Sequence, residues 1–204
     1  MKKIIALTLG LSASLYTQAH MLWLERDIDT QTKAYFGEYS EQLKDTQESS
    51  LKSFNAAVAI QDKQKLKASI QHDHLLYTTQ GNTDVQLSND MMYGESLLRY
   101  HAKAGRMNTK AESELDIVPV QANSSTFQVF YQGKPAANVK VVVFSPEYWQ
   151  KNYSSDTQGM VKIETPWKGQ YVIEASKESD HSGTFEQKPY KKQYLVTTLS
   201  FNHS

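Results

Sequence analysis

The chain has 204 residues, with 22 Lys and Arg against 22 Asp and Glu, six His and no Cys. A formal net charge of zero gives no electrostatic reason to bind nucleic acid, because that affinity comes largely from neutralised phosphates. The lack of Cys excludes disulfides, thiolate metal sites and a cysteine nucleophile, so any bound metal needs nitrogen and oxygen ligands.

Residues 1–19 have the pattern of an export signal. Two lysines precede an apolar run from Ile4 to about Tyr16, and Ala19 supplies a small residue of the kind that a signal peptidase reads. The run is short for a permanent membrane helix, and no comparable run follows it. We therefore expect residues 1–19 to be removed, leaving a periplasmic protein that does not span the membrane.

Cleavage after Ala19 makes His20 the first residue. Its α-amine and imidazole Nδ1 can then chelate one ion in a six-membered ring, and an α-amine pKa of about 7.7–8.0 makes deprotonation easy near neutral pH. With one more imidazole, the three nitrogens form a histidine brace, which suits Cu(II) and also accepts Ni(II), Co(II) or Zn(II). The alternative is that cleavage falls before a histidine by chance.

Residues 20–116 read as a β-rich domain that carries the predicted metal site. The segment from 40 to about 54 is polar and predicts a loop or a short helix, and the segments before and after Gln80-Gly81-Asn82 predict a hairpin. The expected strands are His20–Leu24, Lys33–Tyr39, Ala56–Ile60, Lys67–Ile70, His72–Tyr77 and Val85–Leu87, with Leu97–Ala102 as a strand or a short helix.

Residues 117–204 predict a second domain, an antiparallel β-sandwich. Short β-branched and aromatic segments alternate with turn residues, as in sandwiches, and nothing in this range favours a helix. The expected strands are Phe127–Tyr131, Val139–Phe144, Met160–Ile163, Gln170–Glu174 and Tyr194–Phe201. The fold class is therefore mainly β, with two sandwich-like domains.

Four side chains besides His20 are candidate metal ligands. His72 and His74 would face the same side of a strand, and would be merely solvated if they lie at a turn. His101 has an aromatic neighbour, which fits either a ligand or a hydrogen-bonded core histidine. Glu38 follows Gly37, which permits close backbone approach, so its carboxylate can be a ligand, the acceptor that orients a ligating imidazole, or an outward strand residue.

The three tryptophans, Trp23, Trp149 and Trp167, are better explained by packing in the core and at the sandwich edge than by a sugar-binding platform. Enzyme signatures such as Gly-x-Ser-x-Gly and His-Glu-x-x-His do not occur in the sequence, so we do not expect an enzyme.

Several motifs together resemble a known family. They are Ala19-His20 with Trp23-Leu24, Phe36-Gly37-Glu38-Tyr39, Leu115–Pro119, Phe127–Phe130, Gly133–Pro135, Asp156–Gly159, Pro166–Val172 and Thr197–Phe201. The set resembles the exported proteins of domain-of-unknown-function family 4198, which are also described as NikM-like and associated with cobalt or nickel uptake. The resemblance implies a periplasmic β-rich protein with a transition-metal role, whose second half is similar to transthyretin-like, carboxypeptidase-regulatory-like or Ig-like sandwiches.

These observations favour a protein that captures or delivers Ni, Co, Cu or Zn for uptake or homeostasis. The ion would be held by the His20 amine and imidazole together with His74 or His101, with Glu38 as an additional ligand and His72 as a further candidate. The partner would be a membrane metal transporter or an outer-membrane receptor. Two alternatives stay open. One is a metal-free module that binds protein or glycan, and the other is an oxidative enzyme that uses copper in the brace.

Overall fold

The computed structural model of this protein describes residues 20–28 and 30–204, and the predicted export signal at 1–19 lies outside these ranges. Regular structure in the described residues is almost entirely β, as predicted. The polar segment after residue 39 holds two short 3₁₀ segments, η1 (Tyr39–Glu41) and η2 (Ser50–Phe54).

In the described part of the chain, the strands are β1 (Met21–Ile28), β2 (Gln31–Glu38), β3 (Leu43–Lys44), β4 (Val58–Gln61), β5 (Gln64–Leu66), β6 (Ala68–Ile70), β7 (Leu75–Thr78), β8 (Val85–Tyr93), β9 (Ser96–Ala104), β10 (Leu115–Pro119), β11 (Thr126–Tyr131), β12 (Lys134–Pro135), β13 (Lys140–Phe144), β14 (Gln150–Ser154), β15 (Met160–Lys162), β16 (Gly169–Ser179), β17 (Gly183–Phe185), β18 (Lys188–Tyr190) and β19 (Lys192–His203).

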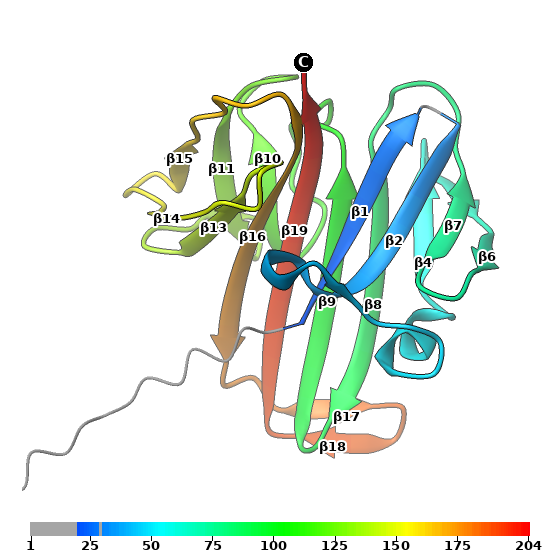
Figure 1. Cartoon of the computed structure of the whole chain (residues 1–204). Helices are drawn as coiled ribbons and strands as arrows, with labels where there is room; N and C mark the ends of the chain where they lie inside the picture. The colour runs from blue at the N-terminus through cyan, green and yellow to red at the C-terminus, as the bar shows by residue number, and fades with distance from the viewer. Residues whose placement is uncertain (1–19, 29) are drawn as a thin grey trace, which may run out of the picture.

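The largest sheet runs through the whole molecule (Figure 1). Its eight strands follow the order β14-β13-β16-β19-β9-β8-β4-β5. At its centre β9 and β19 are parallel, with Tyr100 opposite Val196 and His101 opposite Thr197. The other strand pairs of this sheet are antiparallel.

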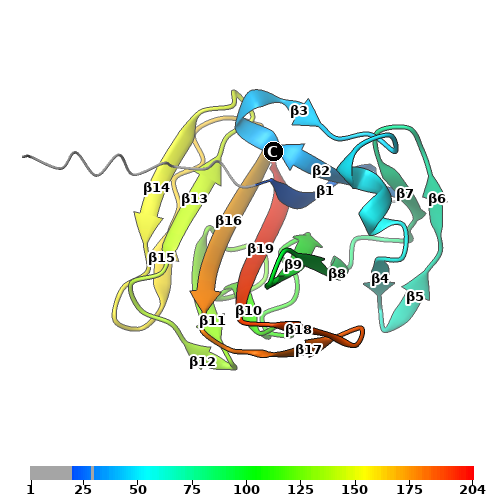
Figure 2. The ribbon, with the colours of Figure 1, turned by 90° about the horizontal axis from the view of Figure 1, so that it is seen from below.

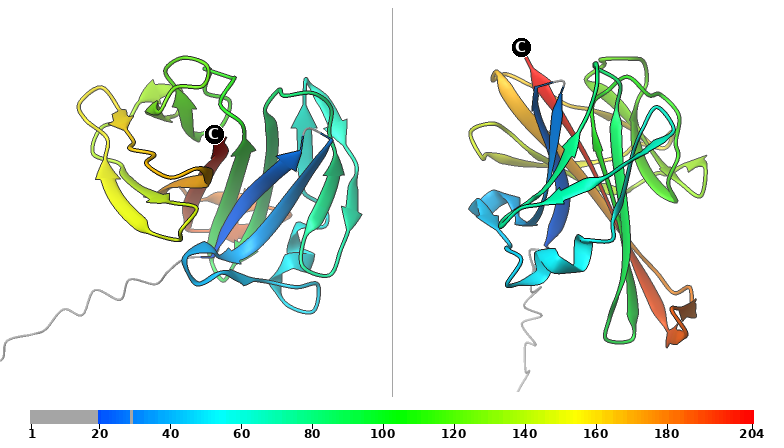
Figure 3. Two further views of the ribbon diagram at one scale, coloured as in Figure 1. Left: turned by 45° about the horizontal axis from the view of Figure 1, so that its top comes forward. Right: turned by 90° about the vertical axis from the view of Figure 1, so that its right-hand side faces the viewer.

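Two smaller sheets cover opposite faces of this large sheet (Figure 2; Figure 3). One contains β1-β2-β7-β6 with β3 beside β2, and the other contains β10-β11-β12 with β15 beside β11. Because successive side chains of a strand point to opposite faces, Val196 of β19 enters the first core whereas Leu195 and Leu199 enter the second. The molecule is therefore sandwich-like on both faces of one shared sheet.

Strand β1 is buried on both of its own faces. Leu22 and Leu24 pack into the first core, while Met21 and Trp23 join a separate cluster with Phe144 and other residues of β13 and β16. This explains why β1 begins with an unbroken apolar run instead of the alternation typical of a strand with one solvated face.

Side chains of β19 attach β1 to the large sheet. Every second residue of β19 from 198 to 202 donates a side-chain hydrogen bond to a backbone carbonyl of β1. The bonds are Thr198 Oγ1 to Leu22 at 2.7 Å, Ser200 Oγ to Leu24 at 2.5 Å and Asn202 Nδ2 to Arg26 at 3.0 Å. The first two bonds are buried, so they satisfy the Leu22 and Leu24 carbonyls inside the protein.

The predicted division at residue 116/117 falls inside β10, and the strands on its two sides share the large sheet. The two main apolar cores follow the division more closely. Residues 22–104 supply all of the first core except Val196, and residues 115–201 supply the second. Within 117–204 the strand pairs are antiparallel, which confirms that prediction.

The predicted hairpin around Gln80-Gly81-Asn82 is wrong. β7 pairs with β2 and β6, whereas β8 pairs with β4 and β9. The buried Gln61 side chain binds both the backbone N–H and the carbonyl of Gln80, at 3.0 and 2.8 Å. The segment after β7 is thereby held on β4, so that the chain crosses between sheets instead of reversing.

Candidate functional site

His20 and Glu38 are brought together by the pairing of β1 with β2. Met21 lies opposite Gly37 in the antiparallel register, which places His20, one residue before β1, opposite Glu38 at the end of β2. The imidazole Nδ1 is 3.7 Å from Glu38 Oε1. The ring rests against Phe36, with centroids 5.4 Å apart, and its side chain is 43% exposed.

Asp45 reaches the other side of the same imidazole. After β2 the chain turns through η1 and returns as β3, and the Asp45 N–H then donates to the Phe36 carbonyl at 2.8 Å. Asp45 Oδ1 lies 3.6 Å from His20 Nε2, and its Oδ2 is buried with no hydrogen-bond partner among the described residues. The imidazole is thus placed between two carboxylates.

Gly37 permits this return of the chain. Its φ is +149°, and a Cβ at this position would collide with the backbone carbonyl oxygen of Leu43. The close approach of β3 to β2 therefore requires glycine. The prediction that Gly37 allows close backbone approach beside Glu38 is confirmed.

This arrangement suits an ion held at Nδ1. When His20 is the first residue, its α-amine and Nδ1 form the chelate, and Glu38 is near enough to supply an oxygen ligand. Asp45 then faces Nε2, the ring nitrogen away from the ion, where a carboxylate fixes the orientation and tautomer of a ligating imidazole. Sequence reasoning missed Asp45, because only the η1–β3 return brings this loop residue to the first strand.

His74 and His72 lie elsewhere. Residues 71–74 precede β7 and are not part of a strand, so His72 and His74 lie at a turn and do not share the face of a strand. His74 Nδ1 is 2.7 Å from Asp73 Oδ1, a hydrogen bond that lowers the pKa of Asp73, and the His74 ring packs on Tyr35. Tyr35 and Phe36 point to opposite faces of β2, so His74 and His20 are on opposite faces of that sheet.

His72 is an exposed residue whose Nδ1 lies 3.4 Å from Glu48 Oε2. Its backbone carbonyl accepts a hydrogen bond from the Gln47 N–H at 2.8 Å, so its contacts join two surface loops. The structure does not bring His72 to the carboxylates around His20.

His101 is on the opposite face of the large sheet from His20. The neighbouring Tyr100 packs on Phe36 beneath His20, and side chains alternate along β9. His101 is only 8% exposed, and its Nδ1 lies 3.0 Å from Ser88 Oγ. Burial lowers the pKa of His101 to about 4, so the imidazole is neutral at pH 7. The brace expected from His20 with His74 or His101 therefore lacks its second imidazole in this arrangement.

Within residues 20–28 and 30–204, no group of three or more His, Asp or Glu side chains is arranged to hold a metal ion. An α-amine at His20 would add a nitrogen donor that belongs to the backbone and not to a side chain. The same ranges contain no helix that is both long and apolar enough to cross a membrane.

The sequence of this chain matches the model of one protein family. The model of the domain of unknown function DUF4198 matches residues 28–179. The chain belongs to this family. The match to DUF4198 confirms the resemblance seen in the motifs, and the family's description assigns neither a ligand nor a reaction.

No curated protein matches this DUF4198 member. Among solved structures it is similar to the Bacteroides ovatus mixed-linkage glucan utilization locus SGBP-B in complex with a mixed-linkage heptasaccharide, at 9% sequence identity and a TM-score of 0.20. The aligned region covers 87% of this chain and 45% of that chain, so this chain spans less than half of its length. A TM-score at this level is too low to transfer a ligand.

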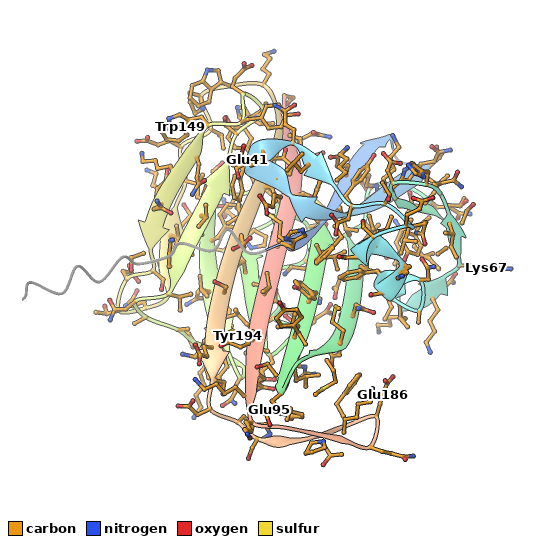
Figure 4. All side chains as sticks on the ribbon, turned by 60° about the horizontal axis from the view of Figure 1, so that its bottom comes forward. Glu41, Lys67, Glu95, Trp149, Glu186 and Tyr194 are labelled. Carbon is orange, nitrogen blue, oxygen red and sulfur yellow. The ribbon has the colours of Figure 1, made fainter. Side chains whose placement is uncertain are left out.

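The tryptophans divide into two environments. Trp23 is 1% exposed and stacks on Tyr35, which confirms core packing. Trp149 and Trp167 are 47% and 38% exposed, and their ring centroids are 5.9 Å apart. Trp149 lies at the outer edge of the molecule beside β14, far from Lys67 at the opposite edge (Figure 4). These two rings pack on each other at the surface and not in a core.

Proposed function

We propose that this protein is a periplasmic binder of a divalent transition-metal ion, Ni, Co, Cu or Zn, which it captures or delivers for uptake or homeostasis. The observation that carries the proposal is the position of the His20 imidazole between Glu38 and Asp45, at 3.7 and 3.6 Å. Removal of residues 1–19 adds the α-amine, so that the donor set becomes two nitrogens and one carboxylate oxygen.

The donor set favours binding over chemistry at the ion. Nitrogen ligands with a carboxylate suit late first-row ions, and ions with this few protein ligands retain positions that a second protein can fill. The half-exposed imidazole leaves the ion accessible from solvent. Exchange with a membrane transporter or an outer-membrane receptor is therefore part of the proposal.

The first experiment compares two proteins that differ only at the amino terminus. One begins at His20, and the other carries one Ala before it. Isothermal titration with Cu(II), Ni(II), Co(II) and Zn(II) should show a site in the first that is lost or weakened at least tenfold in the second. Equal binding by both proteins would refute the chelate.

Variants of the two carboxylates separate their roles. We expect Asp45→Asn to weaken binding by about 10- to 100-fold, the usual cost of losing the carboxylate that orients a ligating histidine. Glu38→Gln should weaken binding as well, through loss of an oxygen ligand. His181→Ala, which changes an exposed histidine near β17, is the matched control and should leave binding unchanged. Unaltered affinity in both carboxylate variants would contradict the roles proposed for Glu38 and Asp45.

Export is tested separately. Mass spectrometry of the protein from a periplasmic extract should show His20 as the first residue. A different first residue would remove the α-amine from the site and with it the proposed mechanism.

A second candidate is glycan binding, which the exposed pair Trp149 and Trp167 favours. The backbone N–H of each tryptophan is hydrogen-bonded. That of Trp149 donates to Ser145 Oγ and that of Trp167 to Tyr171 Oη, both at 3.0 Å. The exposed indole rings, carried by a hydrogen-bonded backbone, offer apolar faces on which sugar rings can stack.

Titration with cellohexaose and maltohexaose tests this candidate. Trp149→Ala and Trp167→Ala should each abolish binding, whereas Tyr93→Ala, which removes an aromatic ring that is 73% exposed at the β8–β9 turn, should not. Equal binding by the tryptophan variants and the unmodified protein would contradict a stacking site.

A further inference from the structure

A large cavity lies on the face of the central sheet opposite the His20 site. Its volume is about 870 Å³, which is in the range of small-molecule sites. The floor comes from β8, β9 and β19, including Ser88, His101 and Leu195, and the segment 107–115 forms one wall. Arg99, two residues before His101 on the same face of β9, also lines the cavity.

His101 supplies an unused hydrogen-bonding atom to this cavity. Its side chain is more than nine-tenths buried and lines the cavity, yet Nε2 has no hydrogen-bond partner among the described residues. Buried polar atoms are usually satisfied in folded proteins, so the unpartnered Nε2 of this cavity-lining residue points to a ligand.

The tautomer of His101 determines whether Nε2 is a hydrogen-bond donor or an acceptor. Nδ1 is 3.0 Å from Ser88 Oγ, and when Nδ1–H donates to that hydroxyl, Nε2 presents a lone pair. Because burial keeps the ring neutral at pH 7, this lone pair is available to a donor. A ligand with an N–H group fits this acceptor.

The charge of the lining favours a cation. Five carboxylates line the cavity against two cationic groups; the lining carboxylates are Asp62, Asp84, Asp90, Glu112 and Glu114, and the cations are Lys63 and Arg99. The Arg99 guanidinium is already engaged by Asp90 at 3.1 Å and by Glu114 at 2.7 Å. The lining therefore carries excess negative charge, which attracts positive ligands.

We propose that this cavity binds a small organic cation, an aliphatic amine with one or more ammonium groups. One ammonium donates to His101 Nε2, a second lies near the exposed carboxylate of Glu112, and the aliphatic chain rests against Ile60, Leu115 and Leu195. The site shares no residue with the metal site proposed at His20, so each proposal is tested independently of the other.

The test is a titration of the chain from His20 to Ser204 with 1,5-diaminopentane and with spermidine. Matched probes are 1,5-pentanediol, which has the same length and no charge, and glutarate, which is an anion of similar length. We expect saturable heat with the amines only, and a loss of affinity of several-fold or more between 20 and 200 mM salt, since salt screens the carboxylates. Binding of glutarate in preference to the amines, or no saturation by any amine, would overturn the proposal.

Two variants locate the binding. His101→Leu removes the acceptor and should weaken amine binding at least tenfold, and Glu112→Gln, at an exposed position that does not threaten folding, should weaken it several-fold. His20→Ala should bind amines as the unmodified protein does. Amine binding that survives both His101→Leu and Glu112→Gln would place the ligand outside this cavity.

Discussion

His20 and His101 both have aromatic residues close by in the sequence, yet their surroundings give them different chemistry. His20 is half exposed, and its two ring nitrogens lie near the Glu38 and Asp45 carboxylates. His101 is enclosed between β8 and the residues around Asp116, and loss of hydration there outweighs the favourable charge of Asp116. The first ring is therefore the candidate metal ligand, and the second is held neutral at pH 7.

The neutral state of His101 predicts a pH dependence of stability. Its pKa is about 4 in the folded protein against 6.5 when unfolded, so the unfolded chain binds more protons between these values. The resulting stability is fully present above about pH 6.5 and is lost as the pH falls toward 4, by about 3 kcal/mol. Urea unfolding from pH 4 to 7.5 should show a weaker pH dependence in His101→Gln than in the unmodified protein.

The matched control for that comparison is His181→Gln, at an exposed position, which should keep the full pH dependence. Other groups also titrate in this range. Burial raises the pKa of Glu174 to about 7, and its effect has the opposite sign, since stability falls as the pH rises from 4.5 to 7. The comparison between variants isolates His101 because Glu174 is common to both proteins. Identical pH slopes in the unmodified protein and His101→Gln would contradict the prediction.

At the scale of elements, the attachment of β1 to the large sheet positions the candidate metal site. β1 carries His20 at its start, and β19 holds β1 through side chains instead of a backbone ladder. A pattern of Thr, Ser and Asn on alternate residues of a strand does not predict that their side chains bind another strand, because the same residues occur on solvated strand faces.

We expect Thr198→Val and Ser200→Ala each to lower the free energy of unfolding by about 1–3 kcal/mol, because each leaves a buried β1 carbonyl without its donor. Asn202→Ala, which removes the exposed bond to the Arg26 carbonyl, is the matched control and should cost less. Chemical denaturation followed by circular dichroism measures all three. A cost for Asn202→Ala as large as for the buried pair would show that the bonds do not act through burial.

At the scale of the whole molecule, one sheet joins the two ranges that the sequence divides. β9 and β19 run parallel through its centre, and each core is closed by strands of this sheet. The candidate metal site and the amine cavity lie on its opposite faces. The sheet is therefore the common support of both proposed sites.

The shared sheet predicts a single cooperative unfolding transition. Trp23 lies in the first range, and Trp149 and Trp167 lie in the second. Fluorescence of a Trp149→Phe, Trp167→Phe double variant and of a Trp23→Phe variant should therefore give the same urea midpoint, once each midpoint is corrected for its own change in stability. Two separate transitions in the unmodified protein, or native-like folding of isolated 20–116, would instead favour independent domains.

The sequence by itself determined the β class, the antiparallel pairing of 117–204, the DUF4198 family and the close backbone approach at Gly37. These follow from alternation, turn residues and local motifs, which act over a few residues. Only the tertiary structure decided three outcomes. Asp45 lies beside His20, His74 and His101 lie on the opposite faces of their sheets from His20, and the chain crosses between sheets at Gln80. Those outcomes depend on which strands pair and which face each residue takes, and a shift of one residue in register reverses the face.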